Sequence, residues 1–489
     1  MYATLRKIVE KDAGQLLLGV LFIVSLGVSF PRVYATDEVQ YFSWVRSLWF
    51  DHDVDFANEY RTFAILNSKS GIAESLLLPN RIRPKTQLYG NIAPVGSALL
   101  WSPWFITADV LLRGVHALGF GQQIPADGYS WPYQRAVCYA SAVYAYMGLL
   151  IVRRIAARWV SSWQSTVATI AFWLATPLVF YMTVQMPFAH ANAFFVSALF
   201  VRAWIWHTEH PTRWQPWVAI GASLGGLFMV REQLILMAVL PLTSVALELI
   251  QTRMSFFSNI RVHLRNYAFF VGTLALVVSP QFIAYTAING EPKPASEVSS
   301  KLNWCSPHAI DTLIDFDPTP EPMCNVPAEP VNIPAWSRGA LVWSPILVFG
   351  IMGLVFFAID FPAYGVPMIV AFVVQIWLNG AFGTTWHLSG AFGFRRYIEC
   401  TPFFIVGGAY LLSKLKRRRA RLTALSLVAF FILWNMGLIV NGTIFNGLTN
   451  VRRGLQWPAL WQWQFSLPQR LWELGGTFFD RCRVLKNGC

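Results

Sequence analysis

Apolar stretches of nearly twenty residues, without a fixed charge inside them, recur along the whole 489-residue chain. A helix needs about 20 such residues to cross the roughly 30 Å hydrocarbon core of a bilayer. Charged residues make up 13% of the chain, compared with about 25% in soluble domains. A soluble domain cannot bury so many apolar segments, so the sequence predicts an all-α polytopic integral membrane protein.

Eleven of these segments are predicted to span the membrane. They are residues 13–34, 135–152, 163–182, 190–207, 216–232, 234–250, 266–288, 340–359, 364–379, 399–413 and 422–440. The first is longer than the roughly 7–15 apolar residues of a signal peptide, so we expect it to stay, with its N-terminus in the cytoplasm.

A further segment, 95–118, leaves the number of spans at 11 or 12. It is apolar enough to cross, but a crossing would place Arg153, Arg154 and Arg158 on the wrong side of the membrane. It is either a re-entrant or interfacial segment or a true span that breaks the charge rule.

The distribution of basic residues sets the orientation. The formal net charge is +13, and much of it falls in the connections 153–162, 208–215, 251–265 and 414–421. Lys and Arg collect on the cytoplasmic side of membrane proteins. The opposite side then receives four segments, namely 35–134, 289–338, 380–398 and the tail from 441. Since no basic soluble domain is present, nucleic acid is excluded as a partner.

We expect one membrane domain, 1–440, with two long outer loops inserted in it, followed by a short non-cytoplasmic tail, 441–489. The first outer loop, 38–93, opens with apolar residues at helical spacing and polar residues on the other faces, which predicts a helix along the membrane surface. The second, 289–338, is rich in proline and is predicted to have little regular structure.

The cysteines agree with this orientation. Cys138 and Cys400 lie in or beside predicted spans, where a cysteine serves as a small buried hydrophobe. The other four fall on the non-cytoplasmic side, where disulfides persist; they are Cys305, Cys324, Cys482 and Cys489. A bond between Cys305 and Cys324 is one option, but spacing alone does not establish connectivity.

Asp37 and Glu38 stand at the outer end of the first predicted span. A carboxylate at a membrane-water boundary can act as a general base, because partial desolvation raises its pKa toward the working pH. The alternative is a solvated helix start, with Thr36 as the N-cap and both acids in the first turn.

The run from Asp51 to Asp55 invites a metal hypothesis, but it lacks the glycine and the final glutamate of an EF-hand loop. An aspartate-rich turn at the end of a helix is the simpler interpretation. Binding of a divalent metal with Asp37 as a partner remains an alternative, and no other cofactor is indicated.

Several short motifs occur in an order known from one family. Asp37-Glu38 is followed by Arg46 and the aspartate-bearing turn, and later by Asn91-Ile-Ala-Pro94-Val-Gly96. Near the other end stand Trp386 and the segment 390–397, which contains Arg395 and Arg396. This arrangement resembles the GT-C superfamily of glycosyltransferases, nearest its branch of aminoarabinose transferases and protein O-mannosyltransferases.

The resemblance implies a membrane enzyme that transfers a sugar from a polyprenyl-phosphate-type donor to a lipid, glycan or protein acceptor. It also implies a location in the bacterial inner membrane, with the active site on the periplasmic face. Asp37 would activate or orient the acceptor hydroxyl, with Glu38 beside it. The sugar, the acceptor and the stereochemical outcome stay open.

Cationic groups are needed for the donor phosphate. Arg395 and Arg396 are the first candidates, because a guanidinium binds phosphate oxygens in bidentate fashion. Arg81, Arg83 and Lys85 in the first outer loop are the alternatives.

Three further ionisable residues lie near the ends of spans. Arg231 and Glu232 come between two predicted helices, and such a pair is either functional or an internal ion pair. His190 stands where relatives in the resembling branch carry an acid. It either binds the acceptor or relays a proton, or it is a satisfied histidine at the membrane interface. A second departure is Ala93, at a position where aminoarabinose transferases have a lysine.

Two other functions remain as alternatives. An O-antigen ligase or polymerase would need an arginine and a histidine in a late outer loop and no acid after the first helix. A lipid-carrier flippase or transporter would need ionisable residues near the bilayer midplane and repeated halves, and the sequence contains no internal repeat.

Overall fold

A computed structural model describes residues 2–251, 260–295, 302–304, 308–314, 339–382, 385–386, 388, 391–445 and 457–475. Within these ranges the regular elements are helices, and the only strand-like pairing is an isolated bridge between Ile82 and Tyr89. The predicted all-α class is confirmed.

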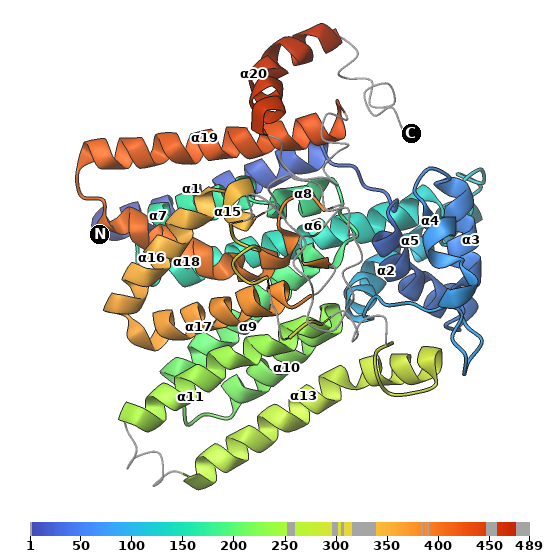
Figure 1. Cartoon of the computed structure of the whole chain (residues 1–489), viewed down its shortest axis with the longest axis horizontal. Helices are drawn as coiled ribbons and strands as arrows, with labels where there is room; N and C mark the ends of the chain where they lie inside the picture. The colour runs from blue at the N-terminus through green and yellow to red at the C-terminus, as the bar shows by residue number, and fades with distance from the viewer. Residues whose placement is uncertain are drawn as a thin grey trace.

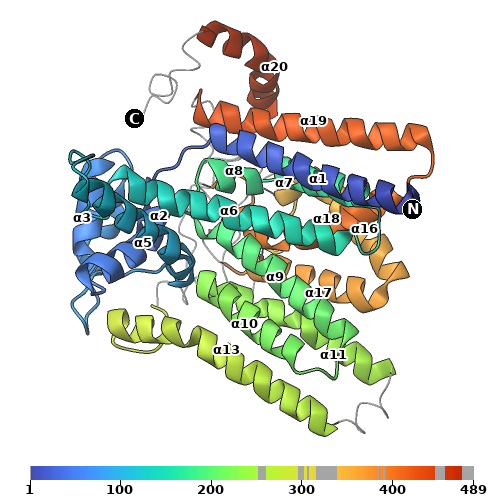
Figure 2. The same cartoon turned by 180° about the vertical axis from the view of Figure 1, so that it is seen from behind.

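Long helices lie roughly side by side through most of the molecule (Figures 1 and 2). They are α1 (Tyr2–Gly27), α6 (Trp131–Ala156), α7 (Ser162–Leu174), α9 (Ala189–Glu209), α10 (Gln215–Val230), α11 (Val239–Gln251), α13 (Ile260–Asn289), α16 (Ile346–Asp360), α17 (Pro362–Gly380), α18 (Thr401–Lys414) and α19 (Arg418–Thr443). Each predicted span overlaps at least one of them.

Five described helices are long and apolar enough to cross a membrane by themselves. They are Trp131–Ala156, Glu232–Ile250, Arg261–Asn289, Pro362–Gly380 and Arg418–Thr443. Three shorter apolar helices accompany them, at Ala13–Gly27, Gln215–Val230 and Ile346–Asp360. The chain is therefore a polytopic membrane protein.

Three predicted spans differ from the observed helices, and a proline stands at each difference. One of them, 340–359, is divided at Pro345 into α15 (Ala340–Trp343) and α16. The first predicted span was expected to reach residue 34, but α1 ends at Gly27 and the chain runs through Pro31 without helix. The segment 163–182 is split into α7 and α8 (Leu178–Thr183) at Pro177. Proline has no backbone N–H to donate, so a helix interior is interrupted there.

The ambiguous segment 95–118 forms α5 (Gly96–Ala117). Both views place α5 with α2 (Thr36–Arg46), α3 (Ala57–Leu66) and α4 (Ile72–Leu76) in a group at one end of the molecule (Figures 1 and 2). Helix α5 packs against α2 and α6 there. This position agrees with the re-entrant or interfacial alternative.

The first outer loop opens with the predicted helix, α2, but the polar face of this helix is covered by protein. Val39 and Phe42 of α2 are fully buried as expected, but Gln40 and Ser43 are also almost completely buried. The reason is that α3, α4 and α5 cover the helix from several sides. Gln40 is satisfied there because its backbone carbonyl accepts from Asn91 Nδ2, at 2.8 Å, and its side chain accepts from Ile92 N.

Contacts between loops sort the helix ends into two groups. At one end Arg158 pairs with Glu209, and the Asn266 side chain donates to the carbonyl of Thr212. These residues lie in, or directly beside, connections predicted to be cytoplasmic. At the other end Lys85 pairs with Glu291. There too the His308 N–H donates to the Gly380 carbonyl, at 3.2 Å, so parts of all three predicted outer loops meet.

Two further predictions concern the cysteines and the tail. Cys138 and Cys400 are fully buried, as predicted. The other four cysteines, including the suggested Cys305–Cys324 pair, lie outside the described residues, as does most of the proline-rich part of loop 289–338. The tail was not expected to contain a helix, but α20 (Trp457–Leu474) packs on α19.

Candidate active site

The first turn of α2 presents its two acids differently. Glu38 is buried, and its carboxylate accepts hydrogen bonds from the N–H groups of Tyr34 (2.6 Å) and Ala35 (2.9 Å). Burial raises the pKa of Glu38 to about 7, although these two backbone donors act in the opposite direction. Ala35 is the N-cap, so the expectation that Thr36 caps the helix is wrong. Glu38 itself satisfies the free N–H groups at the helix start.

Asp37 points away from this cap and meets Arg395. The guanidinium donates to a carboxylate oxygen of Asp37 at 3.3 Å, although 358 positions separate the two residues. The Asp37 side chain is 43% exposed and the Arg395 side chain 21% exposed. Two aromatic residues lie beside Arg395. Its guanidinium is 5.0 Å from the centroid of the Phe188 ring, and the Tyr181 hydroxyl is close enough to act on its charge.

Arg395 begins a short 3-10 helix, η5 (Arg395–Cys400), directly before α18. The preceding turn requires Gly393, which has φ +62° and whose position against Pro177 and Trp343 leaves no room for a Cβ atom. The chain therefore enters η5 at an angle that directs Arg395 toward α2.

Tyr41 lies one turn after Asp37 on α2, and several charged side chains act on its hydroxyl. Burial raises the pKa of its hydroxyl. The charges that act on this hydroxyl come from Arg231, Asp37, Arg395 and Glu232. Charges from the first outer loop, from the junction after α10 and from the late loop therefore act on one phenol.

Arg231 does not pair with its neighbour Glu232. It lies in an extended conformation between α10 and the 3-10 helix η3 (Glu232–Ala238) and forms an ion pair with Glu399 of η5. Its guanidinium is also 2.9 Å from Nδ1 of His190, and this nitrogen is 3.1 Å from the Glu399 carboxylate. Glu232 instead accepts a hydrogen bond from the Tyr285 hydroxyl.

His190 and Glu399 are almost completely buried, with 4% and 0% of their surfaces exposed. Their network joins the start of α9, the end of α10 and η5. This geometry suits the interpretation of His190 as a structural histidine, and it fixes the segment that carries Arg395.

Arg396 faces away from Asp37. It donates to the Thr385 hydroxyl at 3.1 Å and stacks over the Phe382 ring at 4.2 Å. Its Nη1 atom is buried and has no hydrogen-bond partner among the described residues. The two adjacent arginines were expected to act as a pair, but the structure directs them to different surroundings.

The three cations of the first outer loop have other contacts. Arg81 donates to the carbonyl of Ser75 at 3.1 Å, and the Arg83 guanidinium packs on Gly90. Lys85 pairs with Glu291 beyond α13. The structure therefore brings Arg395 to Asp37 and uses Lys85 to join two outer loops.

The carboxylates from Asp51 to Asp55 accept hydrogen bonds from residues of the segment 46–58. Asp51 binds Arg46 and Asn58, while Asp53 accepts from the Ser47 hydroxyl at 2.8 Å. In the part of the chain that the structure describes, no group of three or more His, Cys, Asp or Glu side chains is arranged to hold a metal ion.

Sequence reasoning missed Glu399, Tyr181 and Phe188. Glu399 was included in the predicted span 399–413 as its first residue, although an acid at a span end close to two arginines is a signal for an ion pair. Tyr181 and Phe188 have no comparable signal, since aromatic residues are frequent throughout the chain.

The sequence matches no protein-family model and no curated protein. Among solved structures, the chain is similar to crystal structures of ArnT from Cupriavidus metallidurans, bound to undecaprenyl phosphate and in the apo state. The identities are 13% and 14%, and the TM-score is 0.44 for both. The matches cover 90% and 91% of this chain but 64% and 65% of the ArnT chains, so it spans just under two thirds of their length.

Proposed function

We propose that this protein is a GT-C-type glycosyltransferase that moves a sugar from a polyprenyl-phosphate donor to an acceptor on the non-cytoplasmic face of the membrane. The proposal is supported by the order of the motifs quoted above. It is also supported by the contact between the first motif, through Asp37, and the last motif, through Arg395. The donor lipid would lie in the bilayer with its phosphate at the interface.

The observation that carries the proposal is the contact between Asp37 and Arg395. A displacement at the anomeric carbon of a lipid-phosphate sugar needs a carboxylate for the acceptor and a cation for the departing phosphate at the same depth. This pair supplies both groups within 3.3 Å of each other. Both remain partly exposed and can therefore be reached by substrates.

In the proposed reaction the acceptor oxygen attacks the anomeric carbon while the bond from that carbon to the phosphate oxygen breaks. Asp37 takes the proton of the acceptor hydroxyl. The bonding electrons leave with the phosphate, whose negative charge Arg395 stabilises by charge-assisted hydrogen bonds. Arg396, with a buried donor that is unused among the described residues, is a second candidate ligand for the phosphate.

The other predicted residues receive supporting roles. Glu38 holds the start of α2 and thereby orients Asp37, because its carboxylate is occupied by backbone donors. Arg231, Glu399 and His190 position η5. Arg81, Arg83 and Lys85 shape the outer loops, which we propose form part of the acceptor pocket.

The test is transfer of sugar by purified protein in detergent, with a polyprenyl-phosphate sugar extracted from the membranes of the host. Asp37→Asn keeps the shape of the side chain but removes the base, and we expect a loss of at least about 100-fold. Asp360→Asn is the matched control, because Asp360 is a similarly exposed carboxylate paired with Lys414 on the opposite end of the molecule. It should keep full activity.

The same assay separates the alternative functions. If Arg395→Ala is inactive while Asp37→Ala keeps full activity, the ligase or polymerase hypothesis replaces ours. If the wild-type protein transfers no sugar in detergent but moves the lipid across vesicles, the protein is a transporter.

A further inference from the structure

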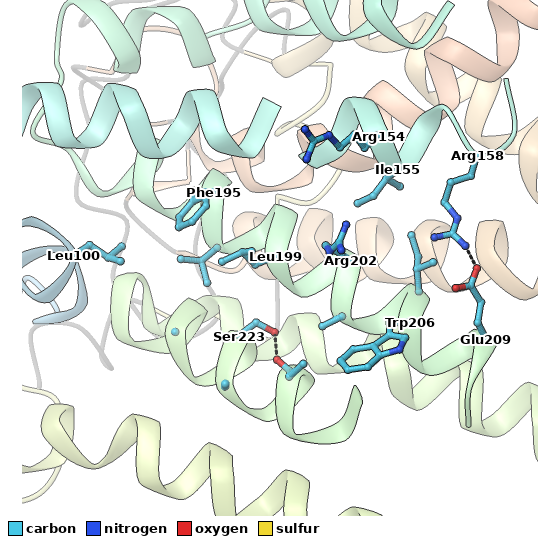
Figure 3. A pocket seen from close by; sticks show the side chains of 16 residues that line it. Leu100, Arg154, Ile155, Arg158, Phe195, Leu199, Arg202, Trp206, Glu209 and Ser223 are labelled. Carbon is cyan, nitrogen blue, oxygen red and sulfur yellow. Dashed lines mark hydrogen bonds and ion pairs between the residues drawn. The ribbon is translucent and has the colours of Figure 1, made fainter. Parts of the chain in front are cut away.

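A cavity of about 670 Å³ lies between α6, α9 and α10, and it shares no lining residue with the Asp37 site. It extends from Leu100 at the start of α5 to the basic end of the molecule (Figure 3). Its size is within the range of about 300–1,000 Å³ that is typical of ligand pockets.

The lining changes from apolar to cationic along the cavity. Figure 3 shows Leu100 at one end, Phe195 and Leu199 next, and then the side chains of Arg154, Arg202 and Arg158. Ala219, Ala222 and Gly226 of α10 form an opposite wall of small residues. A molecule that fits this cavity has an apolar tail and an anionic head.

The arginines are not neutralised by the protein. Arg158 is paired with Glu209, but no described residue forms an ion pair or hydrogen bond with Arg154 or Arg202. Three guanidinium groups against one carboxylate leave a net charge of +2 at this end of the cavity.

Arg202 is the arginine of the cavity that most needs an anionic partner. It lies on α9, within the predicted span 190–207 and seven residues before the helix end at Glu209, which is about 10 Å from that end at a rise of 1.5 Å per residue. An unpaired arginine inside a membrane segment is costly. The charge of the Arg202 guanidinium must therefore reach water or contact a lipid phosphate. The cavity beside it has room for a lipid phosphate.

We propose that this cavity binds an anionic phospholipid from the cytoplasmic leaflet. The phosphate contacts Arg154 and Arg202, and an acyl chain lies along Leu199, Phe195 and Leu100. Basic pockets between membrane helices on the cytoplasmic side are suited to such headgroups. The inference rests on the positions of these residues and on the orientation set by the basic connections, and it is independent of the proposed sugar transfer.

The experiment is native mass spectrometry of the delipidated full-length protein, titrated with phosphatidylglycerol or with phosphatidylcholine of the same acyl chains. We expect preferential retention of phosphatidylglycerol. Arg154→Gln and Arg202→Gln should each weaken its binding about fivefold, the effect of one basic side chain at an anionic lipid surface. Ala222→Phe fills the apolar wall without a change of charge and should also weaken binding.

Arg419→Gln is the matched control, since Arg419 is an exposed arginine in the first turn of α19 and does not line the cavity. The proposal is overturned if Arg419→Gln has the same effect as Arg202→Gln, or if the two lipids bind equally. It is also overturned if inorganic phosphate displaces the lipid while Ala222→Phe has no effect, which would indicate a site for a free anion. Tighter binding of polyprenyl phosphate at the same arginines would make the cavity a donor-lipid site instead.

Discussion

In each of two adjacent pairs of charged residues, Asp37-Glu38 and Arg395-Arg396, the two neighbouring side chains have different contacts. Asp37 is exposed and meets Arg395, whereas Glu38 is buried under the backbone N–H groups of Tyr34 and Ala35. In a short helical turn, successive side chains point in directions roughly 100° apart. Neighbouring residues of each pair therefore have different contacts, and in the proposed site Asp37 meets the substrate while Glu38 supports the helix start.

The buried carboxyl of Glu38 predicts a pH dependence of stability. Its pKa rises from 4.5 to about 7 on folding, so between these values the folded protein holds more protons than the unfolded chain. Stability from this group therefore falls as pH rises from about 4.5 to about 7, and does not change further above that.

Glu38→Gln, which is neutral at every pH, removes this dependence. We expect its thermal midpoint in detergent to rise relative to the wild type as pH increases through that window, by the equivalent of up to about 3 kcal/mol. A constant difference between the two proteins from pH 4 to pH 8 would contradict the assignment.

At the scale of elements, the ion pair between Arg231 and Glu399 joins the end of α10 to η5. Both side chains are largely buried, at 11% and 0% exposure. Removing one partner of a buried pair leaves an uncompensated charge, which costs about 3–5 kcal/mol. Exposed pairs contribute about 0–1 kcal/mol.

A double-mutant cycle tests this element contact. Arg231→Gln and Glu399→Gln should each lower the stability by several kcal/mol, and the double variant should lose much less than their sum. Thermal unfolding in detergent measures all three. The control cycle uses Asp360→Asn and Lys414→Gln at the exposed pair between α16 and α18, where the single variants should have little effect. Additive losses at Arg231 and Glu399 would contradict a coupled pair.

The close approach of α16 and α18 gives the bundle a rigid wall next to η5. A Cβ atom on Gly353 would lie 1.9 Å from the carbonyl oxygen of Gly407. Small residues at such crossings let membrane helices pack backbone to backbone. The loop that carries Arg395 is thus anchored by a helix pair that cannot easily shift.

At the scale of the whole molecule, the site end and the basic end lie opposite each other, which leads to a prediction about sidedness. We expect a membrane-impermeant thiol reagent to label Asp53→Cys, in the α2–α5 end group, in intact cells. Arg419→Cys should be labelled only after lysis, because its basic connection is predicted to face the cytoplasm.

The labelling needs a background in which Cys305, Cys324, Cys482 and Cys489 are replaced by serine, since these are expected to be accessible. Cys138 and Cys400 are buried and can remain. The reverse labelling pattern would invert the orientation and place the Asp37 site in the cytoplasm.

The sequence by itself determined the predicted spans and the sorting of their ends, and it put forward Asp37 with Glu38 and Arg395 among five candidate cations. A membrane segment must satisfy its own backbone hydrogen bonds, so local hydropathy was enough to find a helix at every predicted span. The alternation of basic and non-basic connections likewise divides the helix ends between the two predicted sides of the membrane, and it does so without any knowledge of packing. Even the breaks at Pro31 and Pro177 have a local cause, although the predicted boundaries did not use it.

Only the tertiary structure decided which cation meets Asp37, that α5 joins the end group, and that α2 is buried. It also decided that Arg231 pairs with Glu399 across 168 positions. These outcomes depend on which surfaces pack together over long separations, and the period of apolar residues carries no information about that. A charged residue shows from the sequence that it needs a partner, but only packing selects the partner.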